Sequence, residues 1–190
     1  MSLGDRITAM ADRLAREAIR AGISDNDADR VRRIFIDVAE ARASRLDSRE
    51  HTDVLHTART ALILLEDADA PDLLAPAVAL DTRDPHLMPG LDGLPLDAHE
   101  RALIDEVIAA VSSDIALEEL LAAELPVRLL AVSEALDHAR HLHLRPTSGW
   151  RDCHDRACTV FLPIASRTHP ALARRFDWWC NMFRNRYLRP

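Results

Sequence analysis

Apolar side chains recur along most of the chain with the three- and four-residue spacing of amphipathic helices. The first such segment covers residues 3–21, and a second follows Ser24 and extends to about residue 46. Gly22 predicts the end of the first helix, because glycine readily adopts the left-handed backbone of a helix C-terminus. Ser24 predicts the N-cap of the second helix, since its hydroxyl can accept a hydrogen bond from a backbone N–H. The pattern indicates two helices joined by a short turn.

Two more helices are predicted before the middle of the chain. Asp47 and Ser48 could cap a helix whose apolar stripe covers residues 54–65, and Pro71 suits the first turn of the next helix. The segment 71–81 is apolar on nearly every side. Such a segment is typical of a helix that is buried all round.

The longest predicted loop covers residues 82–96 and contains three prolines and two glycines. Long loops in compact domains often carry function. A shorter break is predicted at residues 145–150. Further helices are predicted at about 97–112, 114–124 and 126–143, and a last one from about residue 169.

Composition supports an all-α fold. Apolar residues make up 48% of the 190 residues, yet aromatic residues make up only 4%. Most of the apolar residues are leucine and alanine, which favour helices, whereas strand-forming residues are scarce. A chain of this length usually forms one domain. We therefore expect a single all-α domain over residues 1–190.

Charge and cysteine content narrow the class of protein. The net charge is −7, which argues against a general nucleic-acid-binding protein. The sequence contains no lysine, so all 24 basic residues are arginines, which bind phosphate through two parallel hydrogen bonds. Only three cysteines occur, and no apolar run is long enough to cross a membrane. We expect a cytoplasmic protein.

The order of His56, a loop and an apolar segment that ends at Asp81 is the most informative motif. It resembles the HD superfamily of metal-dependent phosphohydrolases, and its spacing is most similar to the guanosine-tetraphosphate hydrolase branch. The resemblance covers roughly residues 30–143 and implies an HD-like helical bundle. Residues 151–190 would form a helical extension outside this core.

The resemblance implies a metal site built from His56, Asp81 and Glu134. Glu134 lies in the segment "RLLAVSEALDHARHL", which is similar to the closing segment of the family, where an aspartate stands instead. Asp84 matches a further acidic position of the hydrolase branch and would help to position a catalytic water. The implied cofactor is a divalent ion (Mn, Mg or Fe), and the implied substrate is a nucleotide or another phosphate ester.

Two arginines near these residues are candidate ligands of a substrate phosphate. Arg59 lies three residues after His56 and therefore on the same helix face. Arg83 follows Asp81 in the loop. Arg59 could instead form an ion pair with Asp81.

One departure weakens the expected chemistry. Leu80 stands where the family has the histidine of its His-Asp pair, and leucine cannot bind a metal. His51 or His86 could supply the missing imidazole. The sequence therefore leaves two functions open: a phosphohydrolase with weakened or lost activity, or a non-catalytic regulator that binds a ligand or a protein partner and holds no metal.

Each candidate residue also has a purely structural interpretation. His56 could be a hydrogen-bonded core histidine, Asp81 a helix cap, and Glu134 a surface carboxylate. The motif would then be fortuitous and the protein an unspecified helical bundle.

Other residue groups offer weaker alternatives. Glu134, His138 and His141 share one helix face and could hold a displaced metal ion. A zinc site could instead draw on residues near the C-terminus, namely Cys153, His154, Cys158, His169 and Cys180. The C-terminal helix interleaves aromatic residues with arginines, which could bind a partner or nucleic acid. We expect its aromatic stripe to pack on the domain or across a homodimer.

Overall fold

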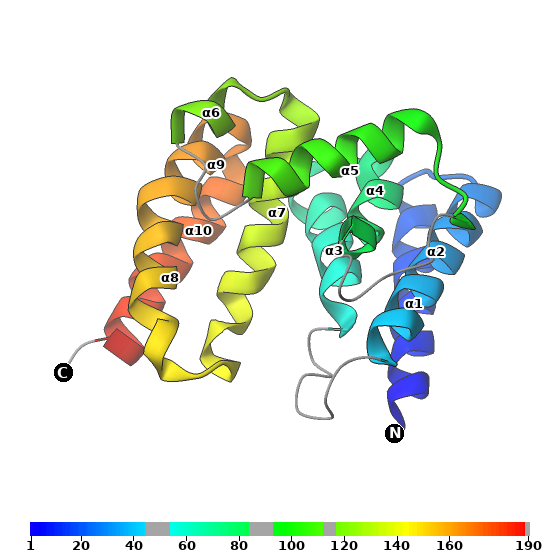
Figure 1. The fold of residues 1–190 in the computed structure, drawn as a ribbon, viewed down its shortest axis with the longest axis horizontal. Helices are drawn as coiled ribbons and strands as arrows, with labels where there is room; N and C mark the ends of the chain where they lie inside the picture. The colour runs from blue at the N-terminus through cyan, green and yellow to red at the C-terminus, as the bar shows by residue number, and fades with distance from the viewer. Residues whose placement is uncertain (45–53, 84–92, 112–116, 189–190) are drawn as a thin grey trace.

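The protein is an assembly of helices (Figure 1). The computed structural model describes backbone and side chains in residues 1–44, 54–81, 93–111 and 117–188, and the backbone alone at residues 82 and 83. All regular structure in these residues is helical, which confirms the all-α prediction. The α-helices are α1 (Leu3–Arg20), α2 (Asp25–Ala43), α3 (His56–Ala68), α4 (Leu74–Val78), α5 (Ala98–Val111), α6 (Leu117–Ala122), α7 (Leu125–His141), α8 (Trp150–Arg156), α9 (Leu162–Thr168) and α10 (Pro170–Phe183).

The predicted turn between the first two helices is present. Gly22 has a φ of +90°, a conformation that costs glycine little. The N–H of Ile23 donates to the carbonyl of Ala18 across this turn. The Ser24 hydroxyl then accepts a hydrogen bond from the N–H of Asp27 at 3.1 Å and caps α2. These local signals were sufficient to place both helix ends.

The apolar segment at 71–81 is buried as predicted, but it is not one helix. It divides into a 3-10 turn (Pro71–Leu73), the short helix α4, and a second 3-10 turn, η3 (Leu80–Arg83). Pro76 lies within α4 and has no N–H to donate, which limits a regular helix through this segment. The division gives Asp81 a position on η3.

Helix α3 begins at His56, and Leu55 is its N-cap residue. Several residues singled out by the sequence lie outside the described residues: Asp47, Ser48, His51, Asp84 and His86.

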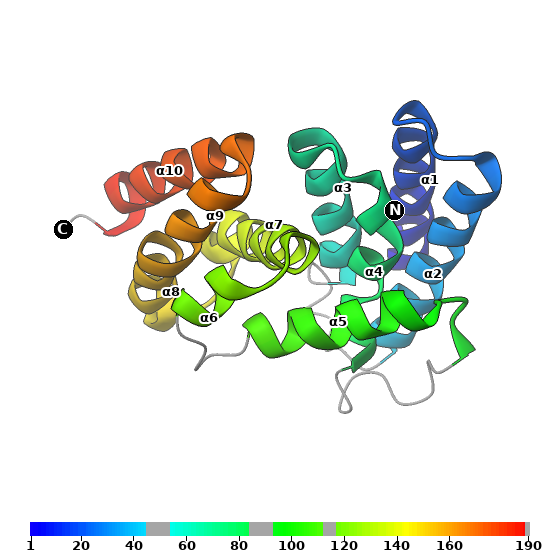
Figure 2. The ribbon, with the colours of Figure 1, turned by 90° about the horizontal axis from the view of Figure 1, so that it is seen from above.

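Helices α3 and α7 pack against each other at the centre of the molecule. Helices α1 and α2 lie on one side of this pair, and α8, α9 and α10 lie on the other (Figures 1 and 2). Helix α5 runs across α4 and α7. None of the described helices has the length and apolar character needed to span a membrane.

The C-terminal aromatic stripe packs into the protein. Phe176, Trp179 and Phe183 on α10 are buried, whereas Trp178 is 64% exposed. Helix α10 contacts α7, α9 and the five-residue π-helix η7 (Ala157–Phe161), which joins α8 to α9. Packing of this stripe on the domain is therefore confirmed, and packing across a homodimer stays a prediction.

Candidate functional site

The structure brings together the three residues that the resemblance singled out as metal ligands. His56 is the first residue of α3, Asp81 lies on η3, and Glu134 lies in the middle of α7. His56 Nε2 lies 3.2 Å from Asp81 Oδ1. One candidate ligand atom of His56 lies within 4.8 Å of a Glu134 carboxylate oxygen. Three elements distant in sequence thus meet at His56, which is buried, while Asp81 and Glu134 are half-buried.

A second imidazole joins this group from α7. His138 lies one helical turn after Glu134, and its ring centre is 4.8 Å from that of His56 in an edge-to-face arrangement. One candidate ligand atom from each of His56, Glu134 and His138 lies within 4.8 Å of the others. Leu80 is only 5% exposed and belongs to the apolar core. The second histidine of the site therefore comes from α7 and not from position 80.

Arg42, in the last turn of α2, forms an ion pair with Asp81. Burial disfavours a charged carboxylate, but the attraction of His56 and Arg42 outweighs this and lowers the pKa of Asp81 to about 2. Asp81 is therefore charged at neutral pH. Its carboxylate contacts both the Arg42 guanidinium and Nε2 of His56.

His56 is unusual because its other nitrogen is unsatisfied. Nδ1 of His56 is buried and has no hydrogen-bond partner in the part of the chain that the structure describes. Burial opposes protonation of the imidazole, yet the negative charge of Asp81, with a smaller contribution from Glu134, raises the pKa of His56. A proton or another cation near this histidine is electrostatically favoured.

Glu134 also holds its proton more tightly than a carboxyl group in water. Burial raises the pKa of Glu134, and the negative charges of Asp81 and Asp137 raise it further against the opposing effect of His56. Two neighbouring groups with raised pKa values indicate a site that would be stabilised by added positive charge.

A second carboxylate on α7 is fully paired. Asp137 receives two hydrogen bonds of 2.8 Å from Nε and Nη2 of Arg59 on α3. His141 Nδ1 lies 3.3 Å from Asp137 Oδ1. Burial is outweighed by these contacts, and the pKa of Asp137 falls to about 2. Arg59 therefore pairs with Asp137 and not with Asp81, and its role as a phosphate ligand stays a prediction.

The side chains of two other predicted site residues, Arg83 and Asp84, lie outside the described structure. The backbone of Arg83 ends η3, but its side chain is outside the described part of the structure, as is the whole of Asp84. The phosphate-binding role of Arg83 and the catalytic role of Asp84 stay predictions.

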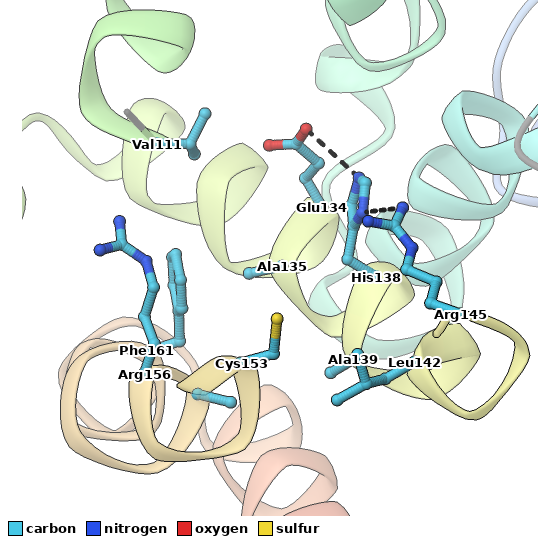
Figure 3. Close-up of a pocket in the computed structure, with 11 residues that line it drawn as sticks. Val111, Glu134, Ala135, His138, Ala139, Leu142, Arg145, Cys153, Arg156 and Phe161 are labelled. Carbon is cyan, nitrogen blue, oxygen red and sulfur yellow. Dashed lines mark hydrogen bonds and ion pairs between the residues drawn. The ribbon is translucent and has the colours of Figure 1, made fainter. Parts of the chain in front are cut away.

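A pocket of about 260 Å³ lies between α7 and the helical segment formed by α8 and η7 (Figure 3). Glu134, His138 and Arg145 lie on one side of it, and Arg156 and Phe161 lie on the other. Arg145 Nη2 lies 3.1 Å from His138 Nδ1. The Arg156 guanidinium lies 5.5 Å from the centre of the Phe161 ring. The metal-binding candidates thus adjoin a pocket with two cations and an apolar wall.

This arrangement fits a divalent ion beside an anionic ligand. Two imidazoles and one carboxylate are donors that suit Mn²⁺, Fe²⁺ or Zn²⁺ better than Mg²⁺, which prefers oxygen ligands. Guanidinium groups suit phosphate oxygens. The buried Nδ1 of His56 lacks the partner that such an ion would provide.

The cysteine-rich alternative is assembled only in part. His154, Cys158 and Cys180 form a second group with candidate ligand atoms within 4.8 Å of one another. Cys153 is exposed, and neither it nor His169 belongs to this group. Cys158 and Cys180 are joined as a disulfide.

No protein-family model matches this chain, and neither a curated protein nor a solved structure matches it. Evidence for its function therefore comes from the side chains themselves.

Proposed function

We propose that the protein is a cytoplasmic, HD-like metal-dependent phosphohydrolase with weakened activity toward a nucleotide or another phosphate ester. The observation that carries this proposal is the convergence of His56, Glu134 and His138 beside a pocket that contains two arginines. The resemblance of the His56, Asp81 and Glu134 segments to the HD superfamily agrees with this convergence.

In this proposal His56, Glu134 and His138 would hold one divalent ion. Asp81 binds Nε2 of His56 and so leaves Nδ1 as the nitrogen without a partner. A carboxylate that holds the far side of a metal-binding imidazole fixes the ring and increases its basicity. Asp81 would then orient His56 and add negative charge to the site. His138 would replace the imidazole that Leu80 lacks.

The contact between Arg145 and His138 disfavours metal binding by His138 in this structure. An arginine can only donate, so its contact with His138 Nδ1 requires a neutral His138 to carry its proton on Nε2. That nitrogen, which is 3.7 Å from Glu134 Oε1, must lose its proton to bind a metal. If His138 held a divalent ion through Nε2, its proton would lie on Nδ1, and Arg145 could no longer donate to that nitrogen.

The remaining roles follow from the pocket. Arg156, together with Arg145, would bind the phosphate group, and Phe161 and the neighbouring apolar side chains would contact the rest of the ester. A bound divalent ion would supply Lewis acidity at the phosphate. Three protein ligands and a single ion account for weak activity compared with a fully equipped site.

The proposal is tested with chelator-stripped protein, given Mn²⁺, Fe²⁺, Zn²⁺ or Mg²⁺ and a panel of nucleotides and simple phosphate esters. We expect slow phosphate or pyrophosphate release that requires the metal and is lost in His138→Gln. His141→Gln is the matched control, because His141 lies on the same helix but contacts Asp137. Turnover that persists in His138→Gln, or absence of turnover with every metal, would contradict the proposal.

A second function is favoured by the ion pair between Arg42 and Asp81. This pair already places a cation on Asp81, and the apolar Leu80 fills the position of a ligand. A regulator that binds a phosphate-containing ligand in the same pocket without hydrolysis would need no metal ion. Metal-independent binding of a nucleotide, weakened by Arg156→Ala and unaccompanied by turnover, would favour this function.

A further inference from the structure

A buried histidine and two cysteines meet where α8, η7 and α10 pack together. His154 lies on α8, Cys158 on η7 and Cys180 on α10. Cys158 Sγ lies 3.4 Å from His154 Nε2. The same nitrogen lies 3.0 Å from the carbonyl oxygen of Cys180. The Cα atoms of the two cysteines are 6.1 Å apart, a separation that suits a disulfide.

The two sulfur atoms differ in their surroundings. Cys180 is 6% exposed, whereas Cys158 is half-buried. The reactive form of cysteine is the thiolate, and a neighbouring imidazole can take the proton from the thiol. Nε2 of His154 donates to the Cys180 carbonyl, so the ring nitrogen that can accept a proton is Nδ1, which lies 4.0 Å from Cys158 Sγ. Of the two cysteines, Cys158 combines partial exposure with a contact to a proton acceptor. Cys153 is exposed on the preceding helix but is not part of this group.

We propose that Cys158 and Cys180 form a reversible redox pair that reacts with hydroperoxides. This inference does not depend on the proposed metal site. Cys158 is the attacking residue, Cys180 is the resolving residue, and His154 accepts and returns the proton. The arrangement resembles that of a thiol sensor, in which a partly exposed cysteine stands beside a base and a second cysteine.

The reaction with hydrogen peroxide is balanced. The Cys158 thiol passes its proton to His154, and the thiolate attacks one peroxide oxygen. An S–O bond forms, the O–O bond breaks, and the leaving hydroxide takes the proton from His154 to give water. Cys180 then attacks the sulfenic acid of Cys158, the S–S bond forms, and a second water leaves. Two thiols lose two electrons to one peroxide, and a small dithiol reverses the step by thiol–disulfide exchange.

The disulfide joins η7, which lines the pocket, to α10. Ala157 and Phe161, on either side of Cys158, line the pocket. They belong to the π-helix η7, and such widened turns recur at functional sites. The disulfide therefore restricts η7 relative to α10. We expect faster amide hydrogen exchange over residues 157–161 in the reduced protein than in the oxidised protein.

The test uses the full chain, reduced with dithiothreitol, desalted without air and treated with one equivalent of hydrogen peroxide. Differential alkylation and peptide mass spectrometry then follow each cysteine. We expect the Cys158–Cys180 disulfide to form before Cys153 is oxidised. Cys180→Ser should accumulate a sulfenic acid on Cys158 that a dimedone reagent captures. His154→Gln should slow disulfide formation by about 10-fold, whereas Cys153→Ser should leave the rate unchanged.

Three outcomes would overturn the proposal. The disulfide of the native protein could resist dithiothreitol until the chain unfolds, which would make it a structural link. Cys153 could be oxidised first. Reduced protein could bind Co²⁺ with the absorption bands of thiolate ligation, which would make the group a metal site. The first two readouts use wild-type protein and do not require any variant to fold.

Discussion

Two carboxylates near the interface of α3 and α7 have similar partners but different surroundings. Each contacts one arginine and one histidine: Asp81 with Arg42 and His56, and Asp137 with Arg59 and His141. We refer to these groups as the Asp81 cluster and the Asp137 cluster. Both carboxylates have a pKa of about 2, so both are charged at neutral pH.

The clusters differ in what is left unsatisfied. In the Asp137 cluster, Arg59 binds both carboxylate oxygens, and His141 Nδ1 also lies 2.8 Å from the backbone carbonyl of Asp137. In the Asp81 cluster, Nδ1 of His56 has no partner in the described structure, and Glu134 nearby has a raised pKa. The same residue types thus form a fully hydrogen-bonded ion pair in the Asp137 cluster. In the Asp81 cluster they leave a nitrogen without a partner beside groups that favour an added cation.

The largest expected effect is the loss of folding stability in the variant Asp137→Asn. This variant leaves the Arg59 guanidinium near a neutral amide in a buried position, and breaking a buried ion pair costs about 3–5 kcal/mol. We expect this loss in the free energy of unfolding at pH 7, measured by urea denaturation. A loss below about 1 kcal/mol would contradict the structural role of the Asp137 cluster.

The acid dependence of the same variant sharpens this prediction. The pKa of folded Asp137 lies below its value in an unfolded chain, so its carboxylate stabilises the fold fully above about pH 5. That stabilisation is lost as the pH falls toward 2. The difference between wild type and Asp137→Asn should therefore shrink over this range. A difference that stays constant would mean that the charge of Asp137 is not responsible.

The next effect concerns metal affinity. Glu134→Gln and His138→Gln each remove a proposed ligand, and we expect each to weaken Mn²⁺ or Zn²⁺ binding by about 100-fold in calorimetric titrations. His141→Gln, in the Asp137 cluster, should bind the metal as wild type does. Equal losses in all three variants would show that the two clusters do not differ as described.

The pH dependence of metal binding should have a definite direction. The raised pKa of His56 means that a proton competes with the metal, so apparent affinity should rise with pH by up to about 10-fold per unit until His56 is deprotonated. The His56–Asp81 ion pair behaves oppositely: it stabilises the metal-free fold below about pH 6.5 and fades as the pH rises through the folded pKa. Affinity independent of pH between 6 and 8 would contradict this competition.

The smallest predicted effect is an increase in metal affinity. Arg145→Leu removes the donor that holds Nδ1 of His138 and a positive charge near the site. We expect metal affinity to increase by roughly 3- to 10-fold, while phosphate binding weakens. A decrease in metal affinity would show that Arg145 supports the orientation of His138 that binds the metal.

The features that the sequence predicted correctly depend on local chemistry. Ser24 caps α2, and Gly22 ends the turn after α1, because each effect is decided within a few residues. The resemblance led us to expect His56 near Asp81 and Glu134, and His56 does lie near both. Their role as metal ligands stays a prediction. The segment 71–81 was predicted as one helix because it is apolar on nearly every side, and this pattern does not register the interruption at Pro76.

The features that sequence reasoning missed depend on tertiary packing. Nothing near Arg42 in the sequence indicates that α2 would place it against Asp81. Arg59 was considered for Asp81, but the packing of α3 on α7 brings it to Asp137. His138 was recognised only with its helix neighbours, since its contact with His56 requires two helices to meet.

The most direct test of the central claim is electron paramagnetic resonance of Mn²⁺ added to chelator-stripped protein, with nitrogen hyperfine couplings resolved. The account predicts one bound ion per chain with couplings from two imidazole nitrogens, reduced to one in His138→Gln. A spectrum with oxygen ligands alone, or one unchanged by His138→Gln, would contradict it.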